Sequence, residues 1–254
     1  MTKILAIGNS FSQDATIYLH AMAKYAAIET KVANLYIGGC SLKVHWENAA
    51  SEARHYDFEL NGAYTGQKTS IKEVLDSDDW DIVVMQQASF DSGIVETYYP
   101  YITLLSRYIA AYAPRAMQAI HQTWAYEIDS THEAFRLYGY DQLRMYRALK
   151  KAYNQVSNEL GLKFIPCGDI IQTLRQYKEF DYANGGQSLC RDGFHLHFLY
   201  GRYAAAAIWY KTLLKGDVIK NDFLPLDEHG DLNTALISKI KNVVGHVHKT
   251  LWLE

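Results

Sequence analysis

The strongest constraint on the fold of this chain is a regular alternation of short apolar runs with longer segments that have helical spacing. The apolar runs are rich in β-branched residues, as strands are, and lie at residues 4–7, 31–37, 81–85, 116–120 and 163–166. The helical segments lie at residues 14–28, 98–113, 135–160, 199–214 and 233–251. Strands that alternate with helices pair in parallel and carry helices on both faces, so the pattern predicts an α/β fold.

Length and composition favour a single domain. With 254 residues and 49% hydrophobic content, the chain can bury one large core. No internal repeat or low-complexity linker divides it, so we predict one domain over residues 1–254. The Asn61-Gly62 pair is a strong hairpin signal and predicts a small β-hairpin that projects near residues 56–69.

Charge and cysteine content narrow the partners and the compartment. The net charge of -3 comes from interleaved acidic and basic residues, so no basic stripe could follow a nucleic-acid backbone. Cys40, Cys167 and Cys190 are too few for a disulfide framework, which favours a reducing compartment. No apolar run reaches the length of a signal-peptide core or a membrane span, so we expect no membrane partner. The sequence as it stands favours the cytoplasm, whereas removal of a leader would place the protein in the periplasm or outside the cell.

Small and polar residues follow four of the predicted strands. In open parallel sheets, ligands bind beyond the carboxyl ends of the strands, where these segments would meet. The segments are Gly8-Asn9-Ser10, Gly38-Gly39-Cys40-Ser41, Gln86-Gln87-Ala88-Ser89 and His121-Gln122-Thr123-Trp124.

A serine, a histidine and an aspartate in this chain have the types and positions needed for nucleophilic catalysis. Ser10 follows the first predicted strand, and Asp192 and His195 lie three residues apart far downstream. A serine hydroxyl needs an adjacent base to become a nucleophile, and that base needs an orienting partner. We predict that Ser10 attacks, that His195 is the general base and then the acid, and that Asp192 orients the imidazole.

A tetrahedral intermediate also needs donors for its oxyanion. The candidates are the backbone N–H groups of Ser10 and Gly39 and a side-chain amide from Gln86 or Gln87, between which the sequence does not choose. Trp124 and Tyr126 follow the fourth strand and would either form the wall of a sugar-binding cleft or pack against the sheet edge.

Simpler interpretations of the same residues remain open. Taken alone, Gly-Asn-Ser is equally typical of a turn or a helix N-cap. Ser12 is the competing serine, and we expect it to cap the following helix. His195 and His197 could be two ligands of a metal site, which would need further ligands; we favour His197 as a polar residue at the start of the next helix.

The chain resembles the SGNH, or GDSL-like, hydrolase superfamily in three sequence blocks. Ile7-Gly8-Asn9-Ser10 is similar to the Gly-Asp-Ser block, residues 34–39 resemble the block whose glycine N–H lines the oxyanion hole, and Asp192-Gly193-Phe194-His195 resembles the block that completes the triad. The remaining block departs from the pattern, because Gln86-Gln87-Ala88-Ser89 stands where the family has Gly-x-Asn-Asp. This combination looks like a poorly characterised bacterial branch of the superfamily.

The resemblance implies a three-layer α/β/α sandwich with a flavodoxin-like parallel sheet of about five strands. It also implies hydrolysis of an ester, often of an acyl group on a carbohydrate, so the expected partner is a small-molecule or glycan ester. This mechanism requires no metal and no organic cofactor. An acyltransferase that uses the same triad and a non-catalytic carbohydrate-binding relative are the alternatives, and the oligomeric state is not predicted.

Overall fold

A seven-stranded mixed sheet forms the centre of the molecule. The computed structural model describes residues 1–226 and 230–247, and its strands lie in the order β4-β3-β2-β1-β5-β6-β7. The five parallel strands are β1 (Thr2–Gly8), β2 (Thr30–Tyr36), β5 (Ile82–Met85), β6 (Met117–His121) and β7 (Lys163–Ile165). These five match the predicted strands and follow the flavodoxin-like order, so the predicted fold class is confirmed.

The predicted hairpin is present, but it extends the sheet instead of projecting from it. Strand β3 (Tyr56–Leu60) pairs antiparallel with β2, and β4 (Ala63–Thr69) pairs antiparallel with β3. Asn61 and Gly62 both have positive φ in the turn between them, as a tight hairpin needs. The sheet therefore has seven strands where about five were predicted, because the free edge of β2 takes up the hairpin.

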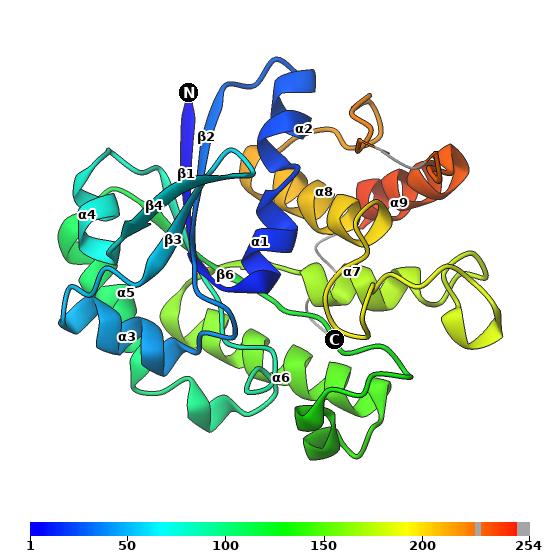
Figure 1. Ribbon diagram of the computed structural model, residues 1–254, viewed down its shortest axis with the longest axis horizontal. Helices are drawn as coiled ribbons and strands as arrows, with labels where there is room; N and C mark the ends of the chain where they lie inside the picture. Colours follow the sequence, from blue (N-terminus) through cyan, green and yellow to red (C-terminus); the bar gives the residue numbers. More distant parts are fainter. Residues whose placement is uncertain (227–229, 248–254) are drawn as a thin grey trace.

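Helices cover both faces of the sheet (Figure 1). One face carries α1 (Ser10–Thr16), α2 (Leu19–Tyr25), α8 (Tyr200–Leu214) and α9 (Thr234–His246). The other carries α3 (Leu42–Ala50), α4 (Ile71–Asp76) and α5 (Tyr101–Tyr112). Helices α6 (Gln142–Leu160) and α7 (Cys167–Leu174) flank the β6–β7 side of the sheet, and short 3₁₀ helices span Val95–Thr97, Glu133–Tyr138 and Tyr182–Asn184.

The helix predictions fail mainly at boundaries and for short elements. The segment predicted at 14–28 is two helices, α1 and α2, and the segment at 135–160 is a 3₁₀ helix followed by α6. Helices α3, α4 and α7 are too short to show a clear periodic pattern and were not predicted. The predicted end of the last helix, at residue 251, lies outside the described residues.

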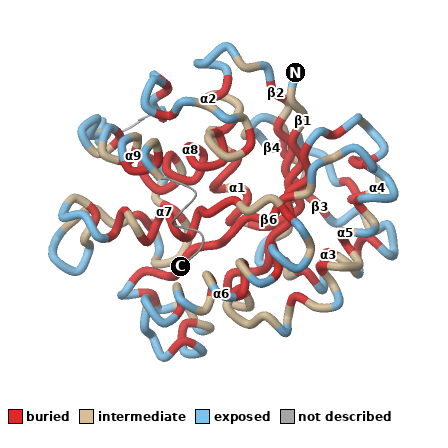
Figure 2. The backbone as a smooth tube through the Cα atoms, turned by 180° about the vertical axis from the view of Figure 1, so that it is seen from behind, coloured by how far each residue is buried: buried red, intermediate tan, exposed pale blue. Residues whose placement is uncertain are grey.

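Buried residues run through the central strands and through α8 (Figure 2). Residues Ile4 to Ile7 of β1 are buried, and so is the run from Tyr203 to Tyr210 in α8. A helix that is apolar on every side is a fully buried helix, and its alanines let its backbone approach the sheet closely. The strand that leads to Ser10 therefore lies in the buried core.

Two further features bear on the surroundings of the protein. The three cysteines are unpaired and buried. Within residues 1–226 and 230–247, no helix has the length and apolarity needed to cross a membrane.

Candidate active site

Ser10 is held at the junction of β1 and α1. Asn9 is the N-cap of α1 and accepts the N–H of Phe11 on its Oδ1 at 3.0 Å, so Ser10 is the first helical residue. Gly8, the last residue of β1, has to be a glycine because a Cβ there would lie 2.4 Å from the Oγ of Ser12. The close approach of strand and helix thus directs the Ser10 hydroxyl out of the carboxyl edge of the sheet.

The structure brings Ser10, His195 and Asp192 into one hydrogen-bonded chain. The Nε2 of His195 lies 2.9 Å from the Oγ of Ser10, and the Nδ1 of His195 lies 2.7 Å from the Oδ2 of Asp192. The other carboxylate oxygen of Asp192 accepts the backbone N–H of His195 at 2.7 Å and that of Phe194 at 3.2 Å. One carboxylate therefore fixes both the imidazole and the backbone that carries it.

The electrostatics of Asp192 suit this arrangement. Partial burial raises the pKa of its carboxyl, but the hydrogen bonds from the His195 ring and from the backbone N–H groups of His195 and Phe194 outweigh that effect, so the net pKa is lowered. An ionised Asp192 accepts the Nδ1–H of His195 and leaves Nε2 free to accept a proton from Ser10.

The Asp192–His195 loop is fastened to α1 by a buried carboxylate. Asp14 is fully buried and accepts the Leu196 N–H at 2.8 Å, the Arg191 Nη1–H at 3.1 Å and the Arg202 Nε–H at 2.7 Å. Because Asp14 lies on the same helix as Ser10, these bonds set the spacing between the nucleophile and the loop that carries its base.

Ser10 and His195 open onto a cavity of about 230 Å³ at the carboxyl ends of β1, β2 and β5. Its walls are mostly aromatic and glycine. The lining residues are Asn9, Ser10, Phe11, Tyr36, Gly38, Gly39, Ser89, Phe90, His132, Phe194 and His195. Tyr36, Phe90, His132 and Phe194 were not predicted as site residues, since side-chain direction and the fold of distant loops bring them there.

Two backbone N–H groups are available for an oxyanion. Ser10 is the first residue of α1, where the N–H has no partner within the helix. Gly39 has a φ of +63°, which favours glycine, and it lines the cavity. Among the described residues, no hydrogen bond uses the N–H of Gly39. The predicted backbone donors are therefore at the cavity with their hydrogens unused.

The two glutamines do not supply the predicted amide donor in this conformation. Both side chains are buried, and neither lines the cavity. The Nε2 of Gln86 donates to Asn9 Oδ1 at 2.5 Å, whereas the Nε2 of Gln87 donates to the carbonyl oxygen of Thr97 at 3.1 Å. Both amide groups thus donate to residues that support the site and not toward the cavity.

Trp124 and Tyr126 lie one layer behind the cavity. Both rings are fully buried. The Trp124 ring stacks on Phe11 with centroids 4.2 Å apart and its Nε1 donates to the Phe194 carbonyl at 2.7 Å, while the Tyr126 hydroxyl lies 2.9 Å from Ser89 Oγ. Neither ring lines the cavity, so the structure places both where the alternative interpretation, packing against the sheet edge, puts them.

Ser12 and His197 both make hydrogen bonds that stabilise local backbone structure. Ser12 lies inside α1, where it donates to the Asn9 carbonyl, so the predicted N-cap role belongs to Asn9 instead. The Nδ1 of His197 accepts the Leu199 N–H at 3.2 Å, close to the start of α8. Within the described part of the chain, no three His, Cys, Asp or Glu side chains are grouped to hold a metal ion.

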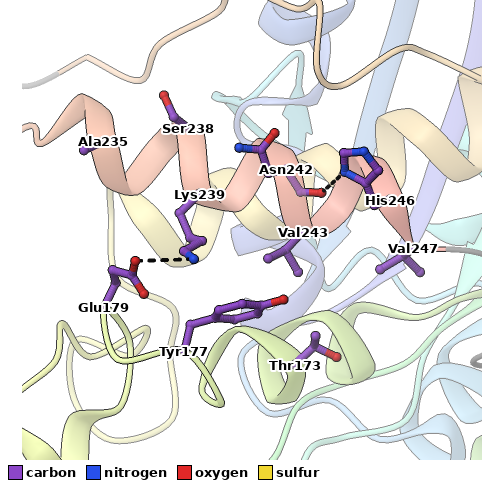
Figure 3. A pocket seen from close by; sticks show the side chains of 10 residues that line it. All are labelled: Thr173, Tyr177, Glu179, Ala235, Ser238, Lys239, Asn242, Val243, His246 and Val247. Carbon is purple, nitrogen blue, oxygen red and sulfur yellow. Dashed lines mark hydrogen bonds and ion pairs between the residues drawn. The ribbon is translucent and has the colours of Figure 1, made fainter.

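A larger hollow lies elsewhere, between α7 and α9 (Figure 3). Its volume is about 710 Å³, and an ion pair between Lys239 Nζ and Glu179 at 3.3 Å crosses its wall. The Lys239 ammonium also lies 4.2 Å from the centroid of the Tyr177 ring. Neither Ser10 nor His195 lines this hollow, so its larger size does not make it the reactive site.

Comparisons with known proteins agree with this architecture. A family model described as "Domain of unknown function (DUF4886)" matches residues 3–240. The crystal structure of a DUF4886 family protein from Bacteroides uniformis ATCC 8492 is 33% identical, with a TM-score of 0.84 over 96% of this chain and 93% of that one. No curated protein matches the sequence.

Two more distant structures relate the fold to hydrolases. A candidate SGNH hydrolase from Slackia heliotrinireducens is 22% identical, with a TM-score of 0.56 over 84% of this chain and 98% of that one. A candidate GDSL-like lipase from Parabacteroides merdae ATCC 43184 is 14% identical, with a TM-score of 0.57 over 83% of this chain and 94% of that one. At these identities the likeness establishes the fold, which is that of the SGNH hydrolases.

Proposed function

The chain belongs to the DUF4886 family, and we propose that it is a serine hydrolase that cleaves esters of short acyl groups. The observation that carries the proposal is the hydrogen-bonded chain from Ser10 through His195 to Asp192, which opens onto a cavity. An isolated serine at a helix start has a structural explanation, but its 2.9 Å contact with an imidazole oriented by a carboxylate matches nucleophilic catalysis.

The proposed reaction proceeds in two halves. Ser10 Oγ attacks the acyl carbonyl while His195 Nε2 takes its proton, and the N–H groups of Ser10 and Gly39 bind the oxyanion. The intermediate collapses to an acyl-serine as His195 returns the proton to the leaving alcohol. Water then attacks the acyl-serine with His195 again as base, which releases the carboxylic acid and restores the serine hydroxyl.

The size of the cavity supports a short acyl group. Its volume of about 230 Å³ is below the range of about 300–1,000 Å³ that is typical of sites for drug-sized ligands. Phe90 and Phe194 line the cavity together with Ser10. Acyl groups such as acetyl fit such a space, and we extend the proposal to O-acylated carbohydrates because Tyr36 and His132 add aromatic faces with polar atoms.

Release of p-nitrophenol from p-nitrophenyl acetate, butyrate and octanoate tests the proposal. We expect kcat/KM to fall with chain length, and Ser10→Ala and His195→Ala to lose on the order of 10³-fold or more in kcat. Melting temperatures of the variants would show that the fold survives. Equal rates in wild type and Ser10→Ala would contradict the proposal, and a release rate that rises with an added sugar acceptor would assign the triad to acyl transfer.

A further inference from the structure

The loop that follows β5 borders the cavity from the side opposite to Gly39. The strand order β2-β1-β5 places Ser10, after β1, between Gly39, after β2, and the residues after β5. Gln86 and Gln87 on this loop point elsewhere, as described above. Two residues of this loop nevertheless line the cavity, Ser89 and Phe90, and of their side chains only that of Ser89 has a polar hydrogen.

The hydroxyl of Ser89 is held from behind by a buried phenol. Its Oγ lies 2.9 Å from the hydroxyl of Tyr126, whose side chain is fully buried. Either hydroxyl can be the donor in this bond, but among the described residues the Tyr126 hydroxyl has no other hydrogen-bond partner, so donation to Ser89 Oγ is the direction that leaves no buried proton of Tyr126 unpaired. Burial raises the pKa of Tyr126, which keeps the phenol protonated as a donor.

With Tyr126 as the donor, the hydrogen of the Ser89 hydroxyl remains available for another acceptor. When Ser89 Oγ accepts from Tyr126, its own hydrogen can turn into the cavity that it shares with Ser10. A hydroxyl that accepts one hydrogen bond becomes a stronger donor for the next, because hydrogen bonds in a chain polarise one another.

From this geometry we infer that Ser89 is a third donor to the oxyanion and that Tyr126 positions and polarises it. The inference rests on the proposed ester hydrolysis and assigns the role that the sequence placed on Gln86 or Gln87. Three strand ends would then each supply one donor: the N–H of Ser10, the N–H of Gly39 and the hydroxyl of Ser89.

The other polar side chains of the cavity fit this role less well. His132 lies against Phe194, with ring centroids 4.8 Å apart, and so belongs to the wall next to His195. The leaving oxygen must be near His195 to receive its proton, so the carbonyl oxygen is directed away from that wall. Tyr36 ends β2 and lies on the side that Gly39 already serves, which leaves Ser89 as the donor on the β5 side.

Steady-state kinetics on a p-nitrophenyl ester tests the inference. We expect Ser89→Ala to lower kcat by about 10²- to 10³-fold with little change in KM, since the bond forms to the transition state. Tyr126→Phe should lower kcat less, and should have no further effect in the Ser89→Ala background because it acts through that hydroxyl. Ser92→Ala and Tyr138→Phe are matched controls.

The controls remove hydroxyls of the same types that bond to the same loop but do not line the cavity: Ser92 lies on the loop that follows β5, and Tyr138, at the end of a 3₁₀ helix, bonds to that loop. Ser92 Oγ donates to the Ala88 carbonyl at 2.8 Å, and the Tyr138 hydroxyl accepts the Gly93 N–H at 3.1 Å. We expect both controls to lower the melting temperature as much as Ser89→Ala does, yet to retain kcat. A loss of kcat in the controls equal to that in Ser89→Ala would reduce Ser89 to a structural role and overturn the inference.

A trifluoromethyl ketone gives a second readout that does not require turnover. Its adduct with Ser10 carries an anionic oxygen, so Ser89→Ala should weaken its binding by about the same factor as kcat/KM. Ketone binding unchanged in Ser89→Ala, or weakened in Tyr36→Phe instead, would overturn the inference.

The outcomes separate this inference from the proposed function. If Ser10→Ala abolishes turnover while Ser89→Ala matches wild type, only the third donor is wrong. If wild type neither hydrolyses the esters nor binds the ketone, the ester hydrolase proposal fails and the inference fails with it.

Discussion

Asn9 shows how much of the site depends on one amide. Its Oδ1 accepts the Phe11 N–H at 3.0 Å and the Gln86 amide at 2.5 Å, and its Nδ2 donates to the Cys40 carbonyl at 3.0 Å. The side chain is buried, and it joins the loops that follow β1, β2 and β5. A carboxylate could replace the two acceptor contacts but not the donation to Cys40, which explains why asparagine suits this chain where the resembling family has aspartate.

We therefore expect Asn9→Asp to lower the free energy of unfolding by roughly 1–3 kcal/mol, because a buried acceptor would face a buried carbonyl. We also expect a lower kcat, since the bond to Cys40 holds the neighbouring Gly39 in place. Urea denaturation and ester kinetics would measure the two effects.

Asn233→Asp is the matched control for this substitution. Asn233 caps α9 by accepting the Ala235 N–H at 3.0 Å, and aspartate accepts equally well at an N-cap. The interpretation of Asn9 would be refuted by an Asn9→Asp variant that is as stable and as active as Asn233→Asp.

At the scale of elements, the site depends on the joining of α1 to the loop between Cys190 and Leu196. Asp14 binds Arg191, Leu196 and Arg202, all of which lie far from it in the sequence. The carboxylate is fully buried, whereas the two arginines are 20% and 12% exposed. The paired charges thus connect the element that carries the nucleophile with the one that carries the base.

Asp14→Asn should weaken the attachment of α1 to the loop between Cys190 and Leu196. Removal of one partner from a buried ion pair costs up to about 3–5 kcal/mol, and the partial exposure of the arginines places the expected loss nearer 2 kcal/mol. We expect kcat to fall at temperatures where the variant remains fully folded, because the distance from Ser10 to His195 is no longer fixed.

Kinetics beside circular dichroism would check this, with Glu47→Gln as a control that removes only an exposed pair with Lys43. A folded Asp14→Asn variant with the kcat of wild type would show that the tether has no part in positioning the base.

Part of this arrangement can be predicted from the sequence alone. The five parallel strands, the place of Ser10 and the spacing of Asp192 and His195 follow from local patterns, since β-branched runs, a glycine turn and a short motif are each contained in a few residues. Local patterns do not give the direction of side chains past a strand end. The sequence therefore leads us to expect Gln86 or Gln87 at the oxyanion, whereas Ser89 is the residue of that loop that lines the cavity and has a polar side chain.

Local sequence patterns also do not predict contacts between segments that are far apart in the chain. Asp14 and Arg202 pair across 188 positions, and nothing in the composition of either segment marks the other. The attachment of the hairpin to β2 likewise depends on a free sheet edge, which is a property of the assembled sheet and not of residues 56–69.

At the scale of the whole molecule, two buried histidines couple stability to pH. His45 lies on α3 and His121 ends β6, and burial lowers the pKa of each to about 3. The Nδ1 of His121 accepts the Trp209 Nε1–H at 2.8 Å, and that of His45 lies 2.9 Å from the Tyr56 hydroxyl. Both rings are therefore neutral in the folded protein at neutral pH.

The sign of the effect follows from the unfolded state, where a histidine has a pKa near 6.5. Below about pH 6.5 the unfolded chain binds these two protons and the folded chain does not, until the pH approaches about 3. The contribution of each ring to the free energy of unfolding is thus fully present above the pKa that histidine has in the unfolded chain. Below that pKa the contribution falls by about 1.4 kcal/mol per pH unit.

We expect urea denaturation to give a free energy of unfolding that falls steeply between pH 6 and pH 5, with an approach to about 2.7 kcal/mol per unit for the two rings together. His121→Gln can still accept from Trp209 and should reduce this slope by about half, as should His45→Gln at the other ring. The double variant should remove the share of the slope that comes from these two rings, because neither state then gains a proton at these positions; burial also lowers the pKa of His132 and of His197, so a smaller slope of the same sign should remain. A double variant whose slope equals that of wild type would show that other groups govern the acid sensitivity of the fold.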